Sequence, residues 1–189
     1  MSNNNMNRLG IGFIGGGFIT RFHIQSLIGV RDCDVIGVMS KTRSSAKDSC
    51  ALARKLRVGD AEVYNSVTDM ISNPNIHALW ICAPNFTRIE IMEEIVSAIE
   101  SGKGELIGVA CEKPLGRNVA EAKQMLALAK RVNLLDGYLE NQVFAPSVTK
   151  GKEIIWARGA STSGRPYLAR ASEEPVSYTH LPLPTILLV

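Results

Sequence analysis

Three consecutive glycines near the amino end, Gly15, Gly16 and Gly17, form the first group of residues with a chemical use. The residues before them have the pattern of a short buried strand, and the residues after them have apolar side chains at helical spacing. Such a turn binds a pyrophosphate, because glycine lets the backbone approach the phosphates and the helix N-terminus directs free N–H groups at them.

This glycine fingerprint is imperfect. The third position of G-x-G-x-x-G, which normally permits close packing of the helix on the strand, holds Thr20 instead of glycine or alanine. Taken alone, the turn fits a connection between any strand and helix about as well as a dinucleotide site.

A charged pair, Glu112 and Lys113, directly follows an apolar stretch and precedes Pro114. If that stretch is a strand of the sheet, Lys113 faces the same crevice as the glycine turn. Beside a nicotinamide ring and partly desolvated, a lysine has a lowered pKa and can share the proton of a substrate hydroxyl, which would make Lys113 catalytic. Without the rest of the pattern, these residues favour a surface ion pair in a loop.

A second basic group, Ser40, Lys41 and Arg43, follows the second expected strand. NAD-binding domains usually have an acidic residue here for the ribose 2′-hydroxyl, and none is present. A hydroxyl with two cations suits the 2′-phosphate of NADP, since Arg can hold two phosphate oxygens. We therefore expect NADP or NAD as the cofactor, with NADP favoured; the alternative is a solvated helix start.

The residues after the fourth expected strand, Ala83, Pro84, Asn85 and Arg88, belong to the same group of strand ends. Pro84 and Asn85 can also simply turn the chain and cap the next helix. Arg88 falls in the first turn of that helix, where a cation is mildly unfavourable and calls for a negatively charged partner. That partner is a ligand anion or, more ordinarily, a surface salt bridge.

These groups require a sheet whose strand ends meet at one edge. Strand and helix patterns alternate through about the first 140 residues, which predicts an α/β fold, a Rossmann doubly wound parallel sheet with helices on both faces. Ligands bind such a sheet at the carboxyl ends of its strands. The expected strands are 9–14, 34–39, 62–64, 76–82, 105–111 and 134–139.

Capping residues mark the ends of the expected helices. Ser66 with Asp69, and Asn118 with Glu121, form capping pairs, and Gly102 ends the helix that begins near position 86. Another helix covers 43–55. The helix after the glycine turn is expected to bury its apolar residues, which are Phe18, Phe22, Ile24, Leu27 and Ile28.

The composition of the 189-residue chain is that of an ordinary soluble protein, with 46% hydrophobic residues, 21% charged residues and a net charge of +3. This small, scattered charge does not indicate nucleic acid or an anionic membrane as a partner, and no apolar run reaches the roughly 20 residues of a membrane span. The four cysteines lack metal-ligand spacing, so we expect reduced thiols, no metal and a cytoplasmic location.

The motifs RLGIGFIGGGF, APN and GVACEKPLGRNVAEA follow one another at expected strand ends. Together they resemble the Gfo/Idh/MocA family of oxidoreductases, with E-K-P as the most specific motif, and the resemblance runs from about Arg8 to Ala171. It implies a Rossmann domain that binds NAD or NADP, followed by an α/β domain for substrate contacts and oligomerisation. It also implies hydride transfer between the nicotinamide and a small-molecule sugar, cyclitol or related polyol in a homo-oligomer.

The resemblance assigns roles around E-K-P. It implies that Lys113 lies beside the nicotinamide and the reacting hydroxyl, with a cis peptide bond permitted before Pro114. Glu112 would orient this lysine or the ribose. Asn85 would contact the nicotinamide ribose.

The resemblance also extends to residues outside that motif. The main chain of Phe18 and Ile19 would join the pyrophosphate turn. Asn141, with Glu140 at the end of the sixth strand, would face the crevice.

Two departures from the family pattern stand out. Family members often carry a histidine three residues after the Asn of P-N, where this chain has Arg88, so the contact made there can differ. They also complete the active site with an Asp and a His in the second domain, the His commonly acting as base. The three histidines of this chain, His23, His77 and His180, are not placed for that role.

The expected domain organisation is a disordered tail at 1–7, a dinucleotide-binding domain at 8–141 and the start of a truncated second domain at 142–175. After Glu174 the sequence has no side chain charged at neutral pH, and its prolines disfavour regular structure. It resembles translated sequencing-adapter tails, so we expect 176–189 to be non-native; a genuine C-terminal extension is the alternative. The chain as it stands is expected to be nearly inactive.

A non-catalytic NADP(H)-binding sensor or interaction domain is the alternative function. Lys113→Ala distinguishes the two, because it should abolish turnover in an enzyme and change little in a sensor. The sequence leaves the substrate and the direction of reaction open.

Overall fold

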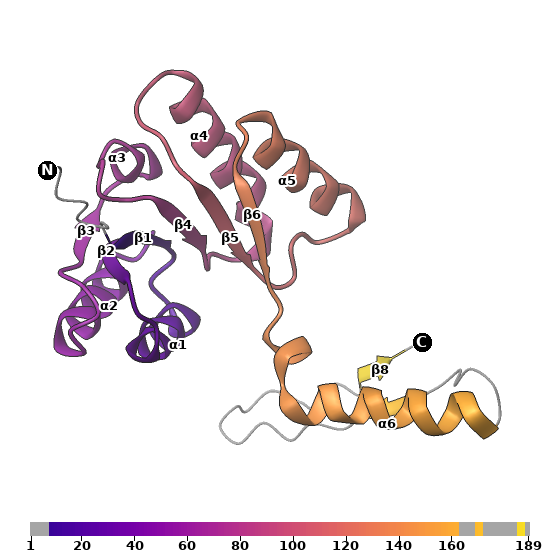
Figure 1. The fold of residues 1–189 in the computed structure, drawn as a ribbon. Helices are drawn as coiled ribbons and strands as arrows, with labels where there is room; N and C mark the ends of the chain where they lie inside the picture. Colours follow the sequence, from indigo (N-terminus) through magenta and orange to yellow (C-terminus); the bar gives the residue numbers. More distant parts are fainter. Residues whose placement is uncertain (1–7, 163–168, 172–184, 188–189) are drawn as a thin grey trace, which may run out of the picture. The chain divides into compact units, whose positions relative to one another are not determined.

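The structure, a computed structural model, describes residues 8–162, 169–171 and 185–187. The chain forms two compact units, Met1–Leu139 and Glu140–Val189. The first contains a six-stranded parallel sheet flanked by helices (Figure 1). Its strands are β1 (Leu9–Ile14), β2 (Cys33–Met39), β3 (Glu62–Tyr64), β4 (Ala78–Ile81), β5 (Gly108–Glu112) and β6 (Leu135–Leu139).

The strand order is β3-β2-β1-β4-β5-β6, and all neighbouring strands are parallel. The chain therefore winds outward from β1 in one direction and from β4 in the other, which confirms the expected doubly wound Rossmann fold. The switch in direction lies between β1 and β4, where such sheets bind their ligands. The helices between the strands are α1 (Phe18–Ser26), α2 (Arg43–Lys55), α3 (Val67–Ile71), α4 (Arg88–Glu100) and α5 (Val119–Arg131), with short 3-10 turns at Leu27–Gly29 and Asn85–Thr87.

Two apolar clusters lie on opposite faces of the sheet. Strand β1 supplies both, because alternate side chains of a strand point to opposite faces: Ile11 and Phe13 pack with α1 and α2, and Ile14 packs with α3, α4 and α5. Gly12 belongs to the second face, where an added Cβ would lie 2.5 Å from Met70 Cε of α3. The glycine in this strand therefore permits α3 to pack closely.

The expected helix ends are confirmed. Ser66 Oγ accepts a hydrogen bond from the Asp69 N–H at 3.0 Å, and Asn118 Oδ1 accepts one from the Glu121 N–H at 3.0 Å. Gly102, with φ +70°, ends α4 by donating its N–H to the Ile99 carbonyl.

The expected apolar side of α1 is wrong in part. Ile24 and Leu27 are buried, but Phe18, Phe22 and Ile28 are 52%, 46% and 62% exposed. The face toward the sheet is formed by Thr20, Ile24 and Leu27. Phe18 and Phe22 each precede a residue of that face, Thr20 and Ile24, by two positions. Two positions correspond to about 200° around a helix, so the two phenylalanines lie on the opposite side of α1.

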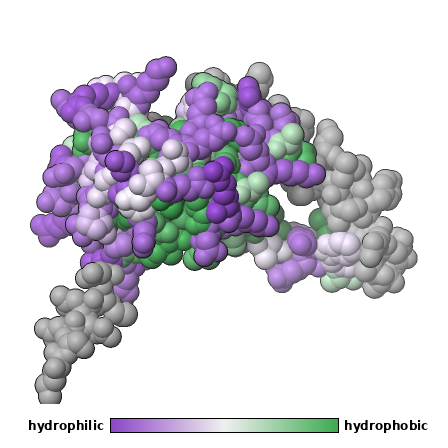
Figure 2. All heavy atoms as spheres, turned by 90° about the horizontal axis from the view of Figure 1, so that it is seen from above, coloured by the Kyte–Doolittle hydropathy of each residue, from purple (hydrophilic) through white to green (hydrophobic). Residues whose placement is uncertain are grey.

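The expectation of a sheet covered on both faces also fails at β6. This strand ends the sheet, and Leu135 and Tyr138 are 71% and 50% exposed. Hydrophobic residues also gather into a surface patch between hydrophilic ones (Figure 2). The first unit therefore carries apolar surface that its own described residues do not cover.

The second unit contains a 3-10 turn at Asn141–Phe144, the helix α6 (Pro146–Thr162), and an antiparallel pair of short strands, β7 (Ala169–Ala171) and β8 (Thr185–Leu187). Pro146 opens α6, as helices favour at their first position. The expected tail at 1–7, and the expected non-native segment at 176–189 apart from β8, lie outside the described residues. Within the described part of the chain, no helix combines the length and apolar character needed to cross a membrane.

Candidate active site

The glycine turn after β1 passes directly over the end of β4. Gly15 has φ +107°, which disfavours other residues, and an added Cβ would lie 2.9 Å from the backbone carbon of Cys82. Gly16 allows α2 to pack closely on the turn, because a Cβ added at Gly16 would lie 2.8 Å from the backbone of Ser45 and Ala46. The turn is thus built from glycine for two different steric reasons.

Gly17 differs from its two neighbours, because a Cβ added there would meet no heavy atom within 4 Å. It is the N-cap of α1, no side chain caps the helix, and the first turn contains no acidic residue. The start of α1 therefore carries a partial positive charge beside open space at Gly17. This arrangement fits a dinucleotide pyrophosphate.

Thr20 fills the position at which the fingerprint departs from glycine or alanine. It is fully buried, and its Oγ1 donates a hydrogen bond to the Gly15 carbonyl at 2.7 Å. The side chain therefore closes the turn instead of obstructing it. Sequence reasoning missed this role; the signal was a small hydroxyl residue on the helix face that meets the strand.

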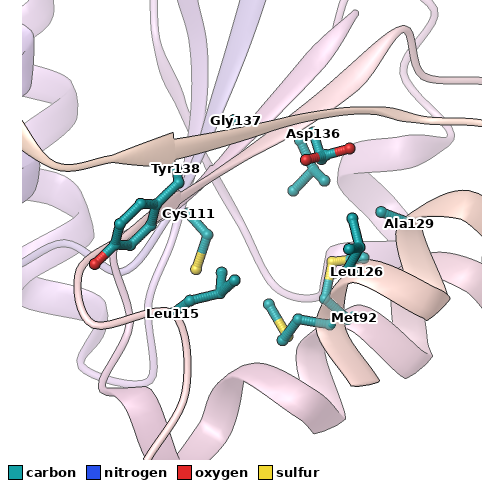
Figure 3. Close-up of a pocket in the computed structure, with 10 residues that line it drawn as sticks. Met92, Cys111, Leu115, Leu126, Ala129, Asp136, Gly137 and Tyr138 are labelled. Carbon is teal, nitrogen blue, oxygen red and sulfur yellow. The ribbon is translucent and has the colours of Figure 1, made fainter. Parts of the chain in front are cut away.

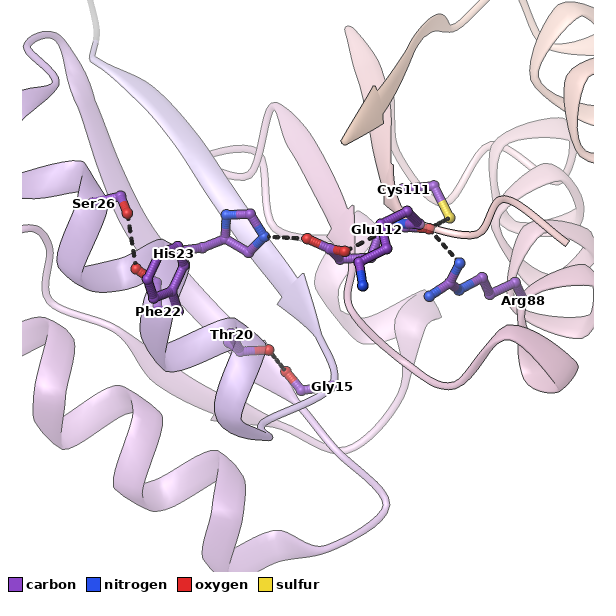
Figure 4. A network of polar contacts seen from close by, with 9 residues as sticks. Gly15, Thr20, Phe22, His23, Ser26, Arg88, Cys111 and Glu112 are labelled. Atoms are coloured by element: carbon purple, nitrogen blue, oxygen red, sulfur yellow. Dashed lines mark hydrogen bonds and ion pairs between the residues drawn. The ribbon is translucent and has the colours of Figure 1, made fainter. Parts of the chain in front are cut away.

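The E-K-P segment begins at the last residue of β5. Glu112 is buried at 6% exposure, while Lys113 is exposed and its peptide bond to Pro114 is cis, as the resemblance allowed. The Glu112 carboxylate lies 2.7 Å from Nε2 of His23 on α1 and accepts the backbone N–H of Lys113 at 3.0 Å (Figure 4). The interpretation as a surface ion pair in a loop is therefore wrong.

Arg88 is also buried, at 4% exposure, so the surface salt bridge expected for it is wrong. Its guanidinium donates to the Ala83 carbonyl at 3.0 Å and to the carbonyls of Glu112 and Pro114. These carbonyls lie at the carboxyl ends of β4 and β5, and together they supply the negative partner that the cation needs. Arg88 therefore connects the loop after β4, which contains Asn85, with the loop after β5, which contains Lys113.

The loop after β4 continues into the 3-10 turn Asn85–Thr87. Ala83 is buried, Pro84 is exposed and Asn85 is half-buried. Thr87, not Asn85, is the N-cap of α4, and no side chain caps that helix. The capping alternative for Asn85 is therefore wrong, and its amide side chain stays a candidate for ligand contact.

The residues after β2 reach toward the end of β3. Ser40 is half-buried, and Lys41 and Arg43 are exposed. The Arg43 guanidinium donates to Oδ1 of Asn65 at 2.5 Å. Asn65 was not identified from the sequence, and it orients Arg43 beside the strand end where an adenosine ribose binds in this fold.

The described chain also contains an apolar pocket and cysteine thiols. A small apolar pocket of about 40 Å³ lies between β5, β6, α4 and α5 (Figure 3), which is too small for a dinucleotide. Among the described residues, no cluster of His, Cys, Asp and Glu could hold a metal ion.

Burial raises the pKa of Cys82 to about 12 and that of Cys111 to about 11, so these thiols stay protonated near neutral pH. Asn141 belongs to the second unit.

Comparison with known proteins agrees with this geometry. Residues 9–136 match the Gfo/Idh/MocA oxidoreductase family, described by its NAD-binding Rossmann fold. Levoglucosan dehydrogenase of Pseudarthrobacter phenanthrenivorans is 29% identical over 154 residues, which cover 79% of this chain and 37% of that protein. Myo-inositol 2-dehydrogenase of Thermotoga maritima is 26% identical over 166 residues, covering 87% and 45%.

The fold recurs in GenD2 from gentamicin A biosynthesis, solved in complex with NAD. The TM-score is 0.67 at 23% identity, over 85% of this chain and 42% of that one. The chain thus spans less than half the length of the proteins that it matches here. The family match over residues 9–136, together with the glycine turn and the E-K-P segment at one sheet edge, shows that this chain belongs to the Gfo/Idh/MocA family of oxidoreductases.

Proposed function

We propose that this chain forms the dinucleotide-binding part of an NAD(P)-dependent dehydrogenase or reductase acting on a sugar, cyclitol or related polyol. The observation that carries the proposal is that an uncapped helix start, Gly17, and an exposed lysine, Lys113, both follow the carboxyl ends of strands in one parallel sheet. The substrate class rests on the two relatives, whose names specify levoglucosan and myo-inositol.

The residues divide the work between binding and chemistry. Gly15 and Gly17, with the main chain of Phe18 and Ile19, bind the pyrophosphate through backbone N–H groups. A bound nicotinamide would accept or donate the hydride. The Lys113 ammonium donates a hydrogen bond to the substrate oxygen and stabilises the negative charge that develops there.

The remaining proton transfer needs a base that these residues do not supply. We propose that a histidine in a second domain takes the hydroxyl proton, so that the 189-residue chain alone turns over little or nothing. The proposed boundaries are 8–141 for the binding domain and 142–175 for the start of the second. The full-length enzyme is proposed to be a cytoplasmic homo-oligomer, with Asn141 contributing to the cofactor site.

Lys113→Ala in a full-length protein that contains this sequence tests the proposal. Turnover should fall by about a thousandfold or more while the cofactor dissociation constant changes by less than about threefold. Lys103→Ala is the matched control, since Lys103 is an exposed lysine in the loop after α4. Unchanged turnover in Lys113→Ala would refute the catalytic role of Lys113, and absence of turnover in the unmodified full-length protein would favour the non-catalytic NADP(H)-binding alternative.

We propose that the cofactor is NADP in preference to NAD. Arg43, held by Asn65, and the neighbouring Ser40 and Lys41 form a basic group without an acidic residue after β2. Titration of the chain with NADPH and NADH should show tighter NADPH binding, and Arg43→Ala should remove that preference. Clearly tighter binding of NADH to the unmodified chain would refute it.

A further inference from the structure

Glu112 connects two parts of the site that are far apart in sequence. Its carboxylate is buried at the end of β5, with Oε1 2.7 Å from His23 Nε2 and Oε2 accepting the Lys113 N–H at 3.0 Å (Figure 4). A buried carboxylate is costly unless it is hydrogen-bonded, so these two partners hold it in place. The same carboxylate thus contacts both α1 and the lysine-bearing turn.

His23 is itself held by aromatic neighbours. Its ring centroid lies 5.1 Å from that of Trp80 on β4 and 6.4 Å from that of Phe13 on β1, and its side chain is only 17% exposed. These contacts fix the plane of the imidazole and direct Nε2 at Glu112. Since an ionised carboxylate only accepts hydrogen bonds, Nε2 carries the hydrogen whenever Glu112 is ionised.

We propose that His23 is a positioning residue for Lys113 and acts through Glu112. By donating to Oε1 it keeps the carboxylate turned so that Oε2 receives the Lys113 N–H, which sets where the lysine side chain leaves the backbone. His23 stands six residues after Gly17 on the same helix. The helix that receives the pyrophosphate thereby also holds the catalytic lysine, a link that rests on the function proposed above.

Two substitutions separate the hydrogen bond from the packing of the ring. His23→Phe keeps an aromatic ring beside Trp80 and Phe13 but removes the donor. His23→Gln removes the ring but keeps an N–H donor at similar reach. A residue that only packs would tolerate Phe better than Gln, whereas the positioning role predicts the reverse order.

The first measurement is amide hydrogen exchange of Lys113 in the 189-residue chain. Exchange should be about tenfold faster in His23→Phe and close to the unmodified rate in His23→Gln. His77→Phe is the matched control, because His77 Nδ1 accepts the Gly10 N–H at 2.7 Å and should affect the Gly10 amide instead. Unchanged Lys113 exchange in His23→Phe, or equally fast exchange in both His23 variants, would overturn the proposal.

The second measurement is turnover by the full-length enzyme. His23→Phe should lower kcat about tenfold or more with little change in KM for the cofactor, and His23→Gln should recover most of the loss. If Lys113→Ala retains turnover, the proposed function fails, and the exchange experiment still decides whether His23 holds Lys113. If Lys113→Ala is inactive while His23→Phe equals the unmodified enzyme, only the positioning role fails.

Discussion

Helices α1 and α5 begin in opposite ways. At the start of α5, Asn118 Oδ1 accepts the Glu121 N–H at 3.0 Å, and the Glu121 carboxylate accepts the Arg117 N–H at 2.8 Å. At the start of α1, Gly17 provides no side-chain cap, and no acidic residue follows in the first turn. The first N–H groups of a helix have no partner within it; α5 satisfies that of Glu121 with its own N-cap side chain, whereas the proposed function places a dinucleotide pyrophosphate at the start of α1.

Under the proposed function, this difference marks a place where a stabilising cap is absent and a ligand binds. Helix α3 is capped in the same manner as α5, by Ser66, and both caps could be recognised in the sequence. Helices α1, α2 and α4, which follow β1, β2 and β4, all begin without a side-chain cap. What distinguishes α1 among them is the open space at Gly17, where an added Cβ would meet no heavy atom within 4 Å.

Among the substitutions at the start of α1, Gly15→Ala is expected to have the largest effect. The φ of +107° and the approach of a Cβ to 2.9 Å from the Cys82 backbone carbon should lower the free energy of unfolding by about 1–3 kcal/mol and abolish dinucleotide binding. Denaturant unfolding and NADPH titration measure the two effects. Gly17→Ala, at an open position, should destabilise the chain less; a fully stable Gly15→Ala variant would contradict the assignment.

Gly17→Asp converts the start of α1 into one resembling that of α5. Because Gly17 has extended backbone and open surroundings, an aspartate can cap the helix, and stability should rise by a few tenths to about 1 kcal/mol. The carboxylate then occupies the N–H groups and repels phosphate, so dinucleotide affinity should fall at least about tenfold. Unchanged affinity in an isothermal titration would show that the pyrophosphate binds elsewhere.

Asn118→Ala removes the cap of α5 and tests the comparison from the other side. Loss of a capping side chain should lower the free energy of unfolding by about 1 kcal/mol. Dinucleotide affinity should stay the same, because α5 does not take part in the proposed site. A marked loss of affinity would place α5 in the binding site and remove the contrast between the two helices.

The smallest effect is expected from Arg117→Ala. A hydrogen bond from the Arg117 side chain lowers the pKa of Glu121 below its usual 4.5. A lowered pKa in the folded state stabilises the fold above the unfolded pKa, and this contribution is lost as the pH falls through the folded pKa. The variant should therefore unfold at a slightly lower temperature than the unmodified chain at pH 7, and this difference should disappear in acid. An equal difference at both pH values would exclude the ion pair as its cause.

Local features were predictable from the sequence because neighbouring residues decide them. The bounds of α2, the caps of α3 and α5 and the stop at Gly102 follow from spacing and from residue types with strong backbone preferences. The alternation of strands and helices was sufficient to predict the doubly wound sheet. The family resemblance could be recognised because the glycine turn, the APN motif and the E-K-P motif follow one another in that order at expected strand ends.

Contacts between distant segments could not be read in the same way. Arg88 was expected at the surface, yet it is buried against carbonyls of two loops that only the sheet brings together. His23 lies 89 residues from Glu112 in the chain, and no local pattern connects them. Phe18 and Phe22 looked like core residues, but the helix turns them away from the sheet.

The sequence by itself determined the class of fold, the order of its elements and the location of the glycine turn and of Lys113, because these depend on periodicity and backbone preference along the chain. The tertiary structure decided which side chains support them. Thr20 closes the turn, Arg88 joins two loops and His23 reaches Glu112 only because the parallel sheet gathers the ends of β1, β4 and β5 at one edge. Hydrogen bonds and burial act between neighbours in space, and the folded sheet alone sets those neighbours.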